Sequence, residues 1–472
     1  MLTAVRLAVA AVAPLSPDEA YYWVWSRDLQ AGYLDAPPMV AWWIRAGTLI
    51  AGQGALGVRL LGPFSAALGS VLLYRAAEAL LPGRNAGIAA AALLNATLLF
   101  GAGAVIMTPD TPLLFFWVCT LWAAAMFARD RNVLWLLVAA VFTGFALNSK
   151  YTAAFLVVGL GLWLMLTPGL WRMLLQPALW WGVFFGVQAF APMVIWNQAH
   201  HWASFAKQGG RVGDFAWGRA GRYLSELVFG QIGLATPLVF LLCAGGVVLA
   251  VRLAWRRRDP VWVLLAALTV PPIVVFVEHA LGDRVQATWP AIIYPAAVIA
   301  ACGLQGRFWE RLRVPAAALG LAMTGVVYLQ AAAAPIPLPA RLDPTALQLA
   351  GWPGLAAQVD LMAQRTGAQF VAADDYGPAA ELARDLPVAV PVIGVEPRWA
   401  FFSLAEPVVT GQTGLLVRSE RRGPNVDLAP WAAVTPIGEA ERKRGDTVIE
   451  RFRVYQVTAR ESGMPMALLP RR

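Results

Sequence analysis

A succession of long apolar segments constrains this chain more than any other feature. Crossing the hydrocarbon core of a bilayer takes roughly 20 mainly apolar residues in a helix. The composition agrees with a membrane location, with 59% apolar and 14% charged residues and a mean hydropathy of +0.59, because soluble chains are less apolar and more charged. The sequence predicts a polytopic α-helical membrane protein of about eleven transmembrane helices, near residues 1–15, 57–80, 86–106, 111–128, 133–149, 152–168, 178–196, 231–251, 261–278, 289–305 and 314–333.

The distribution of charge predicts the orientation. The net charge of +9 resides in residues 1–334, since residues 335–472 hold equal numbers of acidic and basic side chains. With the N-terminus inside, every cytoplasmic turn carries arginine, as the positive-inside rule requires. These turns contain Arg84, Arg129, Arg131, Arg172, Arg252, Arg256, Arg257, Arg258, Arg307, Arg311 and Arg313. Loops that face anionic lipid explain the basic pI, and no nucleic-acid partner is expected.

The hydrophobic pattern of the sequence changes after Ala334. A proline-rich link, Pro335–Pro339, leads into shorter apolar runs between charged residues. We expect helices at 353–366 and 378–384, strands near 369–373, 388–394, 414–418 and 447–457, and a turn at 374–377. The sequence therefore predicts a transmembrane domain at 1–334 and a small soluble α/β domain at 335–472. Eleven preceding helices place that second domain in the periplasm.

Cysteine and histidine usage indicates neither a disulfide framework nor a metal site. Cys119, Cys243 and Cys302 lie within apolar runs without ligand spacing, and adjacent His200 and His201 have poor geometry for one metal ion. No metal ligands are predicted, although a divalent cation stays an open alternative as a cofactor. The first apolar stretch lacks a basic leader and a cleavage site, so we expect it to be the first helix.

The first outer loop, residues 16–56, has the most informative polar residues. Asp18 and Glu19 follow the first helix directly, and four aromatic residues stand between positions 21 and 25. A charge at the membrane edge is costly unless it is solvated or functional. Alternatively, Ser16 or Asp18 caps an interfacial helix whose aromatic residues form a membrane belt. Asp35, before a Pro-Pro turn, adds another carboxylate.

Further polar residues stand at the expected outer ends of helices. Asp110 either caps the next helix or lines a polar cavity. Lys150, with Tyr151 beside it, is the only lysine that adjoins two apolar spans. Its ammonium group either extends to the interface or binds a phosphate. We expect Asp18, Asp110 and Lys150 to gather at one membrane edge.

Two later outer loops hold the remaining candidates. His200 begins the loop that runs to about residue 230, where acceptor contact and simple solvation are both open. Arg284 either contacts a phosphate or forms an ion pair with Asp283. Trp289 follows in a Trp-Pro pair.

Several of these motifs resemble one family of membrane enzymes. Pro17-Asp-Glu-Ala-Tyr-Tyr-Trp23 together with Tyr33-Leu-Asp-Ala-Pro-Pro38 is similar to the first outer loop of the bacterial family-39 type glycosyltransferases. These have the GT-C fold and resemble dolichyl-phosphate-mannose protein mannosyltransferases and lipid A aminoarabinose transferases. Thr108-Pro-Asp-Thr-Pro112 and Ser149-Lys-Tyr-Thr152 also match, whereas Ala36 stands where many relatives have histidine.

The resemblance implies an inverting glycosyltransferase in the bacterial inner membrane. A polyprenyl-phosphate donor would give its sugar to a periplasmic glycolipid, glycan or protein acceptor. Asp18 would be the catalytic base, and Glu19, the second catalytic residue, would orient the acceptor or a neighbouring cation. The implied donor-phosphate ligands are Lys150 and Arg284, and the implied substrate contacts are Asp35, Asp110, Tyr151, His200 and Trp289.

Two other classes of protein remain as alternatives. A transporter or flippase for a lipid-linked or anionic substrate would bury ionisable groups near the midplane and show inverted repeats. In this chain the candidate acids and Lys150 cluster at expected helix ends, and no repeat is visible. A non-catalytic assembly protein would have no need for the Asp-Glu pair, Asp110 and Lys150 together.

Overall fold

The computed structural model describes residues 1–209, 217–387, 389–423, 425–460 and 466–472. The chain divides into two compact units. The helical unit comprises Met1–Leu7, Ala31–Val40 and Leu61–Val326, and the sheet unit comprises Ala8–Gln30, Ala41–Leu60 and Val327–Arg472. The sheet unit thus includes parts of the first outer loop in addition to the C-terminal region.

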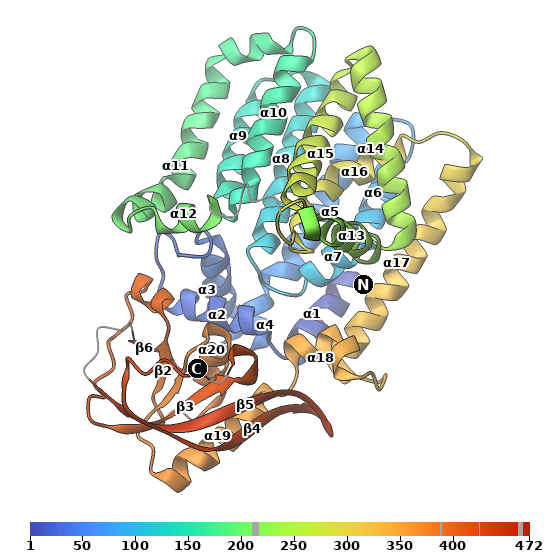
Figure 1. Ribbon diagram of the computed structural model, residues 1–472. Helices are drawn as coiled ribbons and strands as arrows, with labels where there is room; N and C mark the ends of the chain where they lie inside the picture. Colours follow the sequence, from blue (N-terminus) through green and yellow to red (C-terminus); the bar gives the residue numbers. More distant parts are fainter. Residues whose placement is uncertain (210–216, 388, 424, 461–465) are drawn as a thin grey trace. The chain divides into compact units, whose positions relative to one another are not determined.

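The helical unit is a bundle of apolar helices (Figure 1). Its elements are α5 (Leu61–Leu80), α6 (Ala86–Asn95), α7 (Leu98–Gly103), α8 (Asp110–Asp130), α9 (Leu134–Leu147), η1 (Tyr151–Ala153), α10 (Ala154–Leu166), η2 (Leu170–Leu175), α11 (Pro177–Ala199), α12 (Ala203–Gly209), α13 (Trp217–Leu234), α14 (Pro237–Arg257), α15 (Pro260–His279), η3 (Trp289–Ile293), α16 (Tyr294–Cys302) and most of α17 (Arg307–Ala333).

Six helices are long and apolar enough to cross a membrane, namely Ala55–Leu80, Asp110–Asp130, Pro177–Ala199, Pro237–Arg257, Pro260–His279 and Arg307–Ala333. Six shorter apolar helices of 10–17 residues accompany them in the described part of the chain. The chain is therefore a multi-pass membrane protein. The number of eleven spans stays a prediction, because helices of this shorter length fall below the usual requirement.

The expected span at 86–106 is broken in the structure. Helix α6 ends at Asn95, and Thr97 caps α7 by accepting a hydrogen bond from the Phe100 backbone N–H. At this break Gly320 of α17 packs against the chain so closely that a Cβ atom would lie 2.0 Å from the Ala96 carbonyl oxygen. The capping residue and the close helix approach together explain the interruption.

The two ends of the helical unit differ in the charged residues that their turns carry. Successive helices alternate in direction, so the turns after α8, α10 and α14 lie at the same end (Figure 1). These turns carry Arg131, Arg172 and Arg258. Arg84, between α5 and α6, donates a hydrogen bond to the Gly303 carbonyl oxygen at 3.2 Å, which ties two turns at this end together. The opposite end contains the start of α8, the ends of α9 and α11, and η3.

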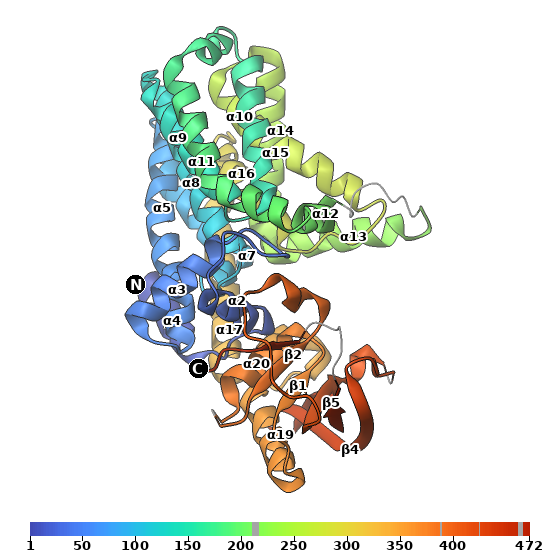
Figure 2. The same cartoon turned by 90° about the vertical axis from the view of Figure 1, so that its left-hand side faces the viewer.

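The sheet unit combines a six-stranded mixed sheet with short helices (Figure 2). Its helices are the last part of α1 (Leu2–Val12), α2 (Pro17–Arg27), most of α3 (Met39–Ala51), α4 (Ala55–Arg59), η4 (Ala340–Leu342), α18 (Pro344–Leu349), α19 (Trp352–Thr366), α20 (Tyr376–Asp385), η5 (Pro397–Phe401) and η6 (Glu420–Arg422). Its strands are β1 (Val371–Ala373), β2 (Val392–Val395), β3 (Thr413–Ser419), β4 (Trp431–Arg444), β5 (Thr447–Ala459) and β6 (Met466–Leu468).

The sheet has the order β4-β5-β3-β1-β2-β6. Strand β1 runs parallel to β2 and β3, whereas the β2–β6, β3–β5 and β4–β5 pairs are antiparallel. The predicted C-terminal α/β character is confirmed, and β1, β3, β5, α19 and α20 match the expected elements. The strand expected at 388–394 corresponds to β2, although residue 388 itself lies outside the described residues. The sequence did not predict β4 or β6.

The backbones of helices α9 and α11 pack closely against each other at glycine residues. A Cβ atom on Gly144 would lie 2.3 Å from the Gly186 carbonyl oxygen, and one on Gly182 would lie 2.6 Å from the Leu137 Cα. Small residues four positions apart allow helix backbones to approach closely in a membrane.

We expect Gly144→Ala to separate α9 from α11 and to destabilise the protein by roughly 1–3 kcal/mol, the usual effect of overpacking. Thermal unfolding in detergent measures this loss. Gly161→Ala is the matched control, because a Cβ atom there meets no atom within 4 Å among the described residues. Equal melting temperatures for the two variants would contradict this account of the packing.

Candidate active site

Helix α2 begins with a complete capping box. The Ser16 side chain accepts a hydrogen bond from the Glu19 backbone N–H at 3.3 Å, and the Glu19 carboxylate accepts one from the Ser16 backbone N–H at 3.0 Å. Pro17 occupies the first turn, where its missing N–H costs nothing. The predicted capping role of Ser16 is confirmed. This arrangement fixes the start of the helix that carries Asp18.

Glu19 is engaged in a buried ion pair. Its carboxylate lies 2.6 Å from Nε and 2.7 Å from Nη2 of Arg59, and both side chains are almost completely buried. Arg59 also donates to the carbonyl oxygens of Ala13 and Pro14, at 2.7 and 2.8 Å. Of the two roles predicted for Glu19, pairing with a neighbouring cation fits these contacts.

A second acid lies in the same region of the sheet unit. Glu381 on α20 is buried, and burial raises its pKa well above the usual range, with Asp385 as the next cause and Glu19 a smaller one. Glu381 is therefore shifted toward its neutral form.

Asp18, in contrast, has an exposed side chain on the first turn of α2. Tyr376, at the start of α20, donates a hydrogen bond to Asp18 Oδ1 at 2.9 Å. Both residues belong to the sheet unit. A solvent-accessible carboxylate on a helix terminus is open to an approaching hydroxyl group, which is one requirement of a general base.

The helical unit brings several other candidates together. Lys150 Nζ donates to Asp110 Oδ1 at 2.7 Å, and each side chain is less than one-fifth exposed. Thr288, immediately before Trp289, donates to the other oxygen of Asp110 at a long 3.5 Å. Asp110, Lys150 and Trp289 therefore belong to one end of the bundle, as the alternation of the spans predicted.

Helix α12 extends this group. The Tyr151 hydroxyl lies 2.6 Å from the Ser204 hydroxyl, and Lys207 forms an ion pair with Asp35. Gln208 donates to the Asp35 carbonyl oxygen at 2.9 Å. Two predicted substrate-contact residues, Asp35 and Tyr151, are thus held by the same short helix.

The remaining candidates lie in less enclosed surroundings. His200 stacks on Trp196 with ring centres 4.0 Å apart, and Trp289 lies 5.6 Å from the His279 ring. Arg284 is 71% exposed and pairs with Glu226 at 2.8 Å. Asp283 accepts a hydrogen bond from the Arg284 backbone N–H at 2.7 Å, so the ion pair of the Arg284 side chain is with Glu226 and not with Asp283.

Unsatisfied polar groups flank Lys150. Both side-chain polar atoms of Asn148 and the Thr152 hydroxyl are buried without a hydrogen-bond partner among the described residues. Buried polar groups in native proteins nearly always have a partner. Their position on either side of Lys150 suits a site whose partners arrive with a ligand.

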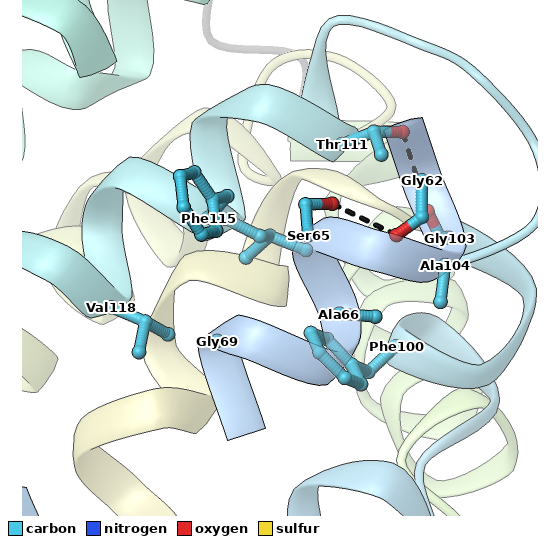
Figure 3. A pocket seen from close by; sticks show the side chains of 11 residues that line it. Gly62, Ser65, Ala66, Gly69, Phe100, Gly103, Ala104, Thr111, Phe115 and Val118 are labelled. Atoms are coloured by element: carbon cyan, nitrogen blue, oxygen red, sulfur yellow. Dashed lines mark hydrogen bonds between the residues drawn. The ribbon is translucent and has the colours of Figure 1, made fainter. Parts of the chain in front are cut away.

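The described residues provide no cluster of three or more His, Cys, Asp or Glu side chains that would hold a metal ion. A small hollow between α5, α7 and α8 is also unsuited to a substrate (Figure 3). Its volume of about 10 Å³ has room for about one water molecule, and its walls are mainly small or apolar residues such as Gly62, Ala66 and Phe115. The polar surroundings of Lys150 are the better candidate.

Arg59 escaped the sequence analysis. It stands at the start of an expected apolar span, and an ionisable residue in such a place is itself a functional or structural signal. Lys207 lies in the outer loop for which acceptor contact and solvation were both open, and Tyr376 lies in the predicted turn at 374–377, but the partner of neither residue was predicted.

Comparison with known proteins agrees with the predicted class. Residues 35–196 match the family model described as dolichyl-phosphate-mannose-protein mannosyltransferase. The chain is also 28% identical over 299 residues to a lipid A galacturonosyltransferase, RgtD, of Rhizobium johnstonii. That alignment covers 62% of this chain and 61% of the relative, less than two thirds of its length.

The fold is similar to two crystal structures of ArnT from Cupriavidus metallidurans. The structure bound to undecaprenyl phosphate has a TM-score of 0.64 and the apo structure one of 0.62, each with 18% identity and 96% coverage of both chains. The predicted resemblance to GT-C type glycosyltransferases is confirmed.

We expect Glu19→Gln to destabilise the sheet unit strongly, by about 3–5 kcal/mol, because it leaves the Arg59 charge buried without its partner. Unfolding of the purified protein in detergent, followed by heat or denaturant, measures this effect. Asp18→Asn is the control at the adjacent, exposed position and should unfold like wild type. A Glu19→Gln variant of unchanged stability would contradict the structural role of the ion pair.

Proposed function

We propose that this protein is an inverting glycosyltransferase that uses a polyprenyl-phosphate sugar donor. The observation that carries the proposal is the exposed Asp18 carboxylate on a helix terminus fixed by a buried ion pair. Asp18 deprotonates the acceptor hydroxyl as that oxygen attacks the anomeric carbon, and the bond from this carbon to the donor phosphate breaks. Glu19 acts indirectly, because its contacts fix the helix.

Lys150 is the proposed ligand of the donor phosphate. An ammonium group has three donors, of which Asp110 uses one, so others remain for phosphate oxygens. The unsatisfied Asn148 and Thr152 side chains are further proposed phosphate or sugar contacts. The ArnT structure with undecaprenyl phosphate supports a polyprenyl-phosphate donor. Positive charge at the departing phosphate lowers the barrier to transfer.

The remaining predicted residues have supporting roles in this proposal. Asp35 and Tyr151, both held by α12, shape the substrate site, as do His200 and Trp289. Arg284 is the proposed second contact of the donor phosphate. To make this contact, its guanidinium group leaves the ion pair with Glu226 and binds the phosphate of the sugar donor.

The proposed location is the bacterial inner membrane, with the site and the C-terminal domain in the periplasm. The arginine-bearing end of the helical unit supports this orientation through the positive-inside rule. The similarity to a lipid A galacturonosyltransferase supports a glycolipid acceptor. Glycan and protein acceptors are the other predicted classes.

We expect Asp18→Asn to lower the transfer rate at least about 100-fold, because it removes the general base. The assay supplies a labelled sugar on polyprenyl phosphate to purified enzyme with lipid A and follows covalent transfer by mass spectrometry. Full turnover by this variant would exclude Asp18 as the base. The transporter alternative predicts that wild type moves the labelled donor across vesicles without any covalent product.

We expect Lys150→Met to raise the KM for the donor about tenfold or more, because it removes a charge-assisted contact with phosphate. The same assay at varied donor concentration measures this. The double variant Lys150→Met/Asp110→Asn avoids an unpaired carboxylate and should show the same rise. Lys443→Met, on β4, is the matched lysine control, and an equal KM in the control and the Lys150 variants would exclude the proposed contact.

A further inference from the structure

Helices α2 and α20 meet at their N-terminal ends within the sheet unit. Gly377, the second residue of α20, approaches α2 so closely that a Cβ atom on it would lie 2.8 Å from the Pro17 Cβ. The adjacent Tyr376 and Asp18 side chains meet beside this contact, with the Tyr376 hydroxyl 2.9 Å from Asp18 Oδ1. A residue from the C-terminal region therefore reaches the proposed base.

The ring of Tyr376 is held on two sides. Its centre lies 4.7 Å from that of the Tyr21 ring, and the guanidinium carbon of Arg398 lies 4.1 Å from it. Arg398 is itself paired with Glu396 at 3.0 Å. Stacking and cation–π contacts of this kind restrict the ring to one orientation.

The backbone before Tyr376 is also fixed. Asp374 forms an ion pair with Arg418, and Asp375 lies 3.3 Å from Arg422. Asp375 also caps α20 by accepting a hydrogen bond from the Gly377 backbone N–H at 3.2 Å. The hydroxyl of Tyr376 consequently points at Asp18 from a rigid support.

The Tyr376 hydroxyl keeps its proton and therefore acts as the hydrogen-bond donor to Asp18. Burial raises its pKa, and the facing Asp18 carboxylate is the next cause. The other charged groups that face it are Arg398, which opposes the rise, and Asp375, which adds to it. The phenol is thus protonated throughout the range in which a carboxylate base works.

We propose that Tyr376 is a positioning residue for the Asp18 base, so that the C-terminal domain contributes directly to the transfer reaction. This inference rests on the proposed function of Asp18. The hydrogen bond directs one carboxylate oxygen toward Tyr376 and thereby sets the plane in which the carboxylate meets the acceptor hydroxyl. It also stabilises the ionised form of Asp18, which is the form that accepts a proton.

Tyr376→Phe tests this inference, because it removes the hydroxyl and keeps the ring between Tyr21 and Arg398. We expect kcat to fall about tenfold with little change in KM, the usual effect of losing a hydrogen bond to a charged group. The acidic limb of the pH profile should move to higher pH, because the ionised carboxylate loses a donor. A purely structural role for the hydroxyl would leave that limb unmoved.

Tyr455→Phe is the matched control, because it removes a tyrosine hydroxyl from β5 in the core of the same domain. It should retain the kcat and pH profile of wild type, and melting temperatures of both variants report on folding. A Tyr376→Phe enzyme with wild-type kcat and pH profile, beside an inactive Asp18→Asn enzyme, would overturn the positioning role alone. Absence of transfer by wild type would overturn the proposed function and this inference together.

Discussion

The buried ion pair between Glu19 and Arg59 is the interaction on which the proposed chemistry depends. A charge pair out of water is stable only when its geometry is good and its remaining donors are satisfied. Both conditions hold, because Glu19 closes a capping box and Arg59 donates to three backbone carbonyl oxygens, those of Ala10, Ala13 and Pro14. The pair fixes the first turn of α2, and the neighbouring Asp18 is left exposed. One carboxylate thus provides rigidity, and its neighbour is the proposed catalytic base.

A similar division of roles applies in the helical unit. Asp110 holds Lys150 at the end of the bundle, while buried polar groups on either side of the lysine have no partner among the described residues. In the proposed function this preformed site binds the donor phosphate without first ordering a flexible side chain. The opposite end of the bundle is rich in arginine and contains none of the candidate residues. Charge therefore distinguishes the two faces of the membrane domain.

Many of the helices could be predicted from the long apolar runs and from the polar, proline and glycine residues that separate them. A long apolar run in a bilayer is stable as a helix, because the helix satisfies its own backbone hydrogen bonds. The short helices within residues 16–56 and the strand β4 could not be predicted in this way, since β4 is a charged edge strand that lacks a clear apolar alternation. Glu19, Asp110 and Lys150 were predicted individually, but Arg59 was not predicted and neither was any of the ion pairs. Glu19 and Arg59, like Asp110 and Lys150, are 40 positions apart, and only tertiary structure reveals such contacts.

The stereochemistry of the product tests the central claim most directly. A carboxylate that acts as a base in a single displacement inverts the anomeric carbon, whereas a carboxylate nucleophile acts twice and retains the configuration. NMR of the anomeric proton in the donor and in the purified product measures this outcome. The account predicts a product with the anomeric configuration opposite to that of the donor. A product with retained configuration would contradict it.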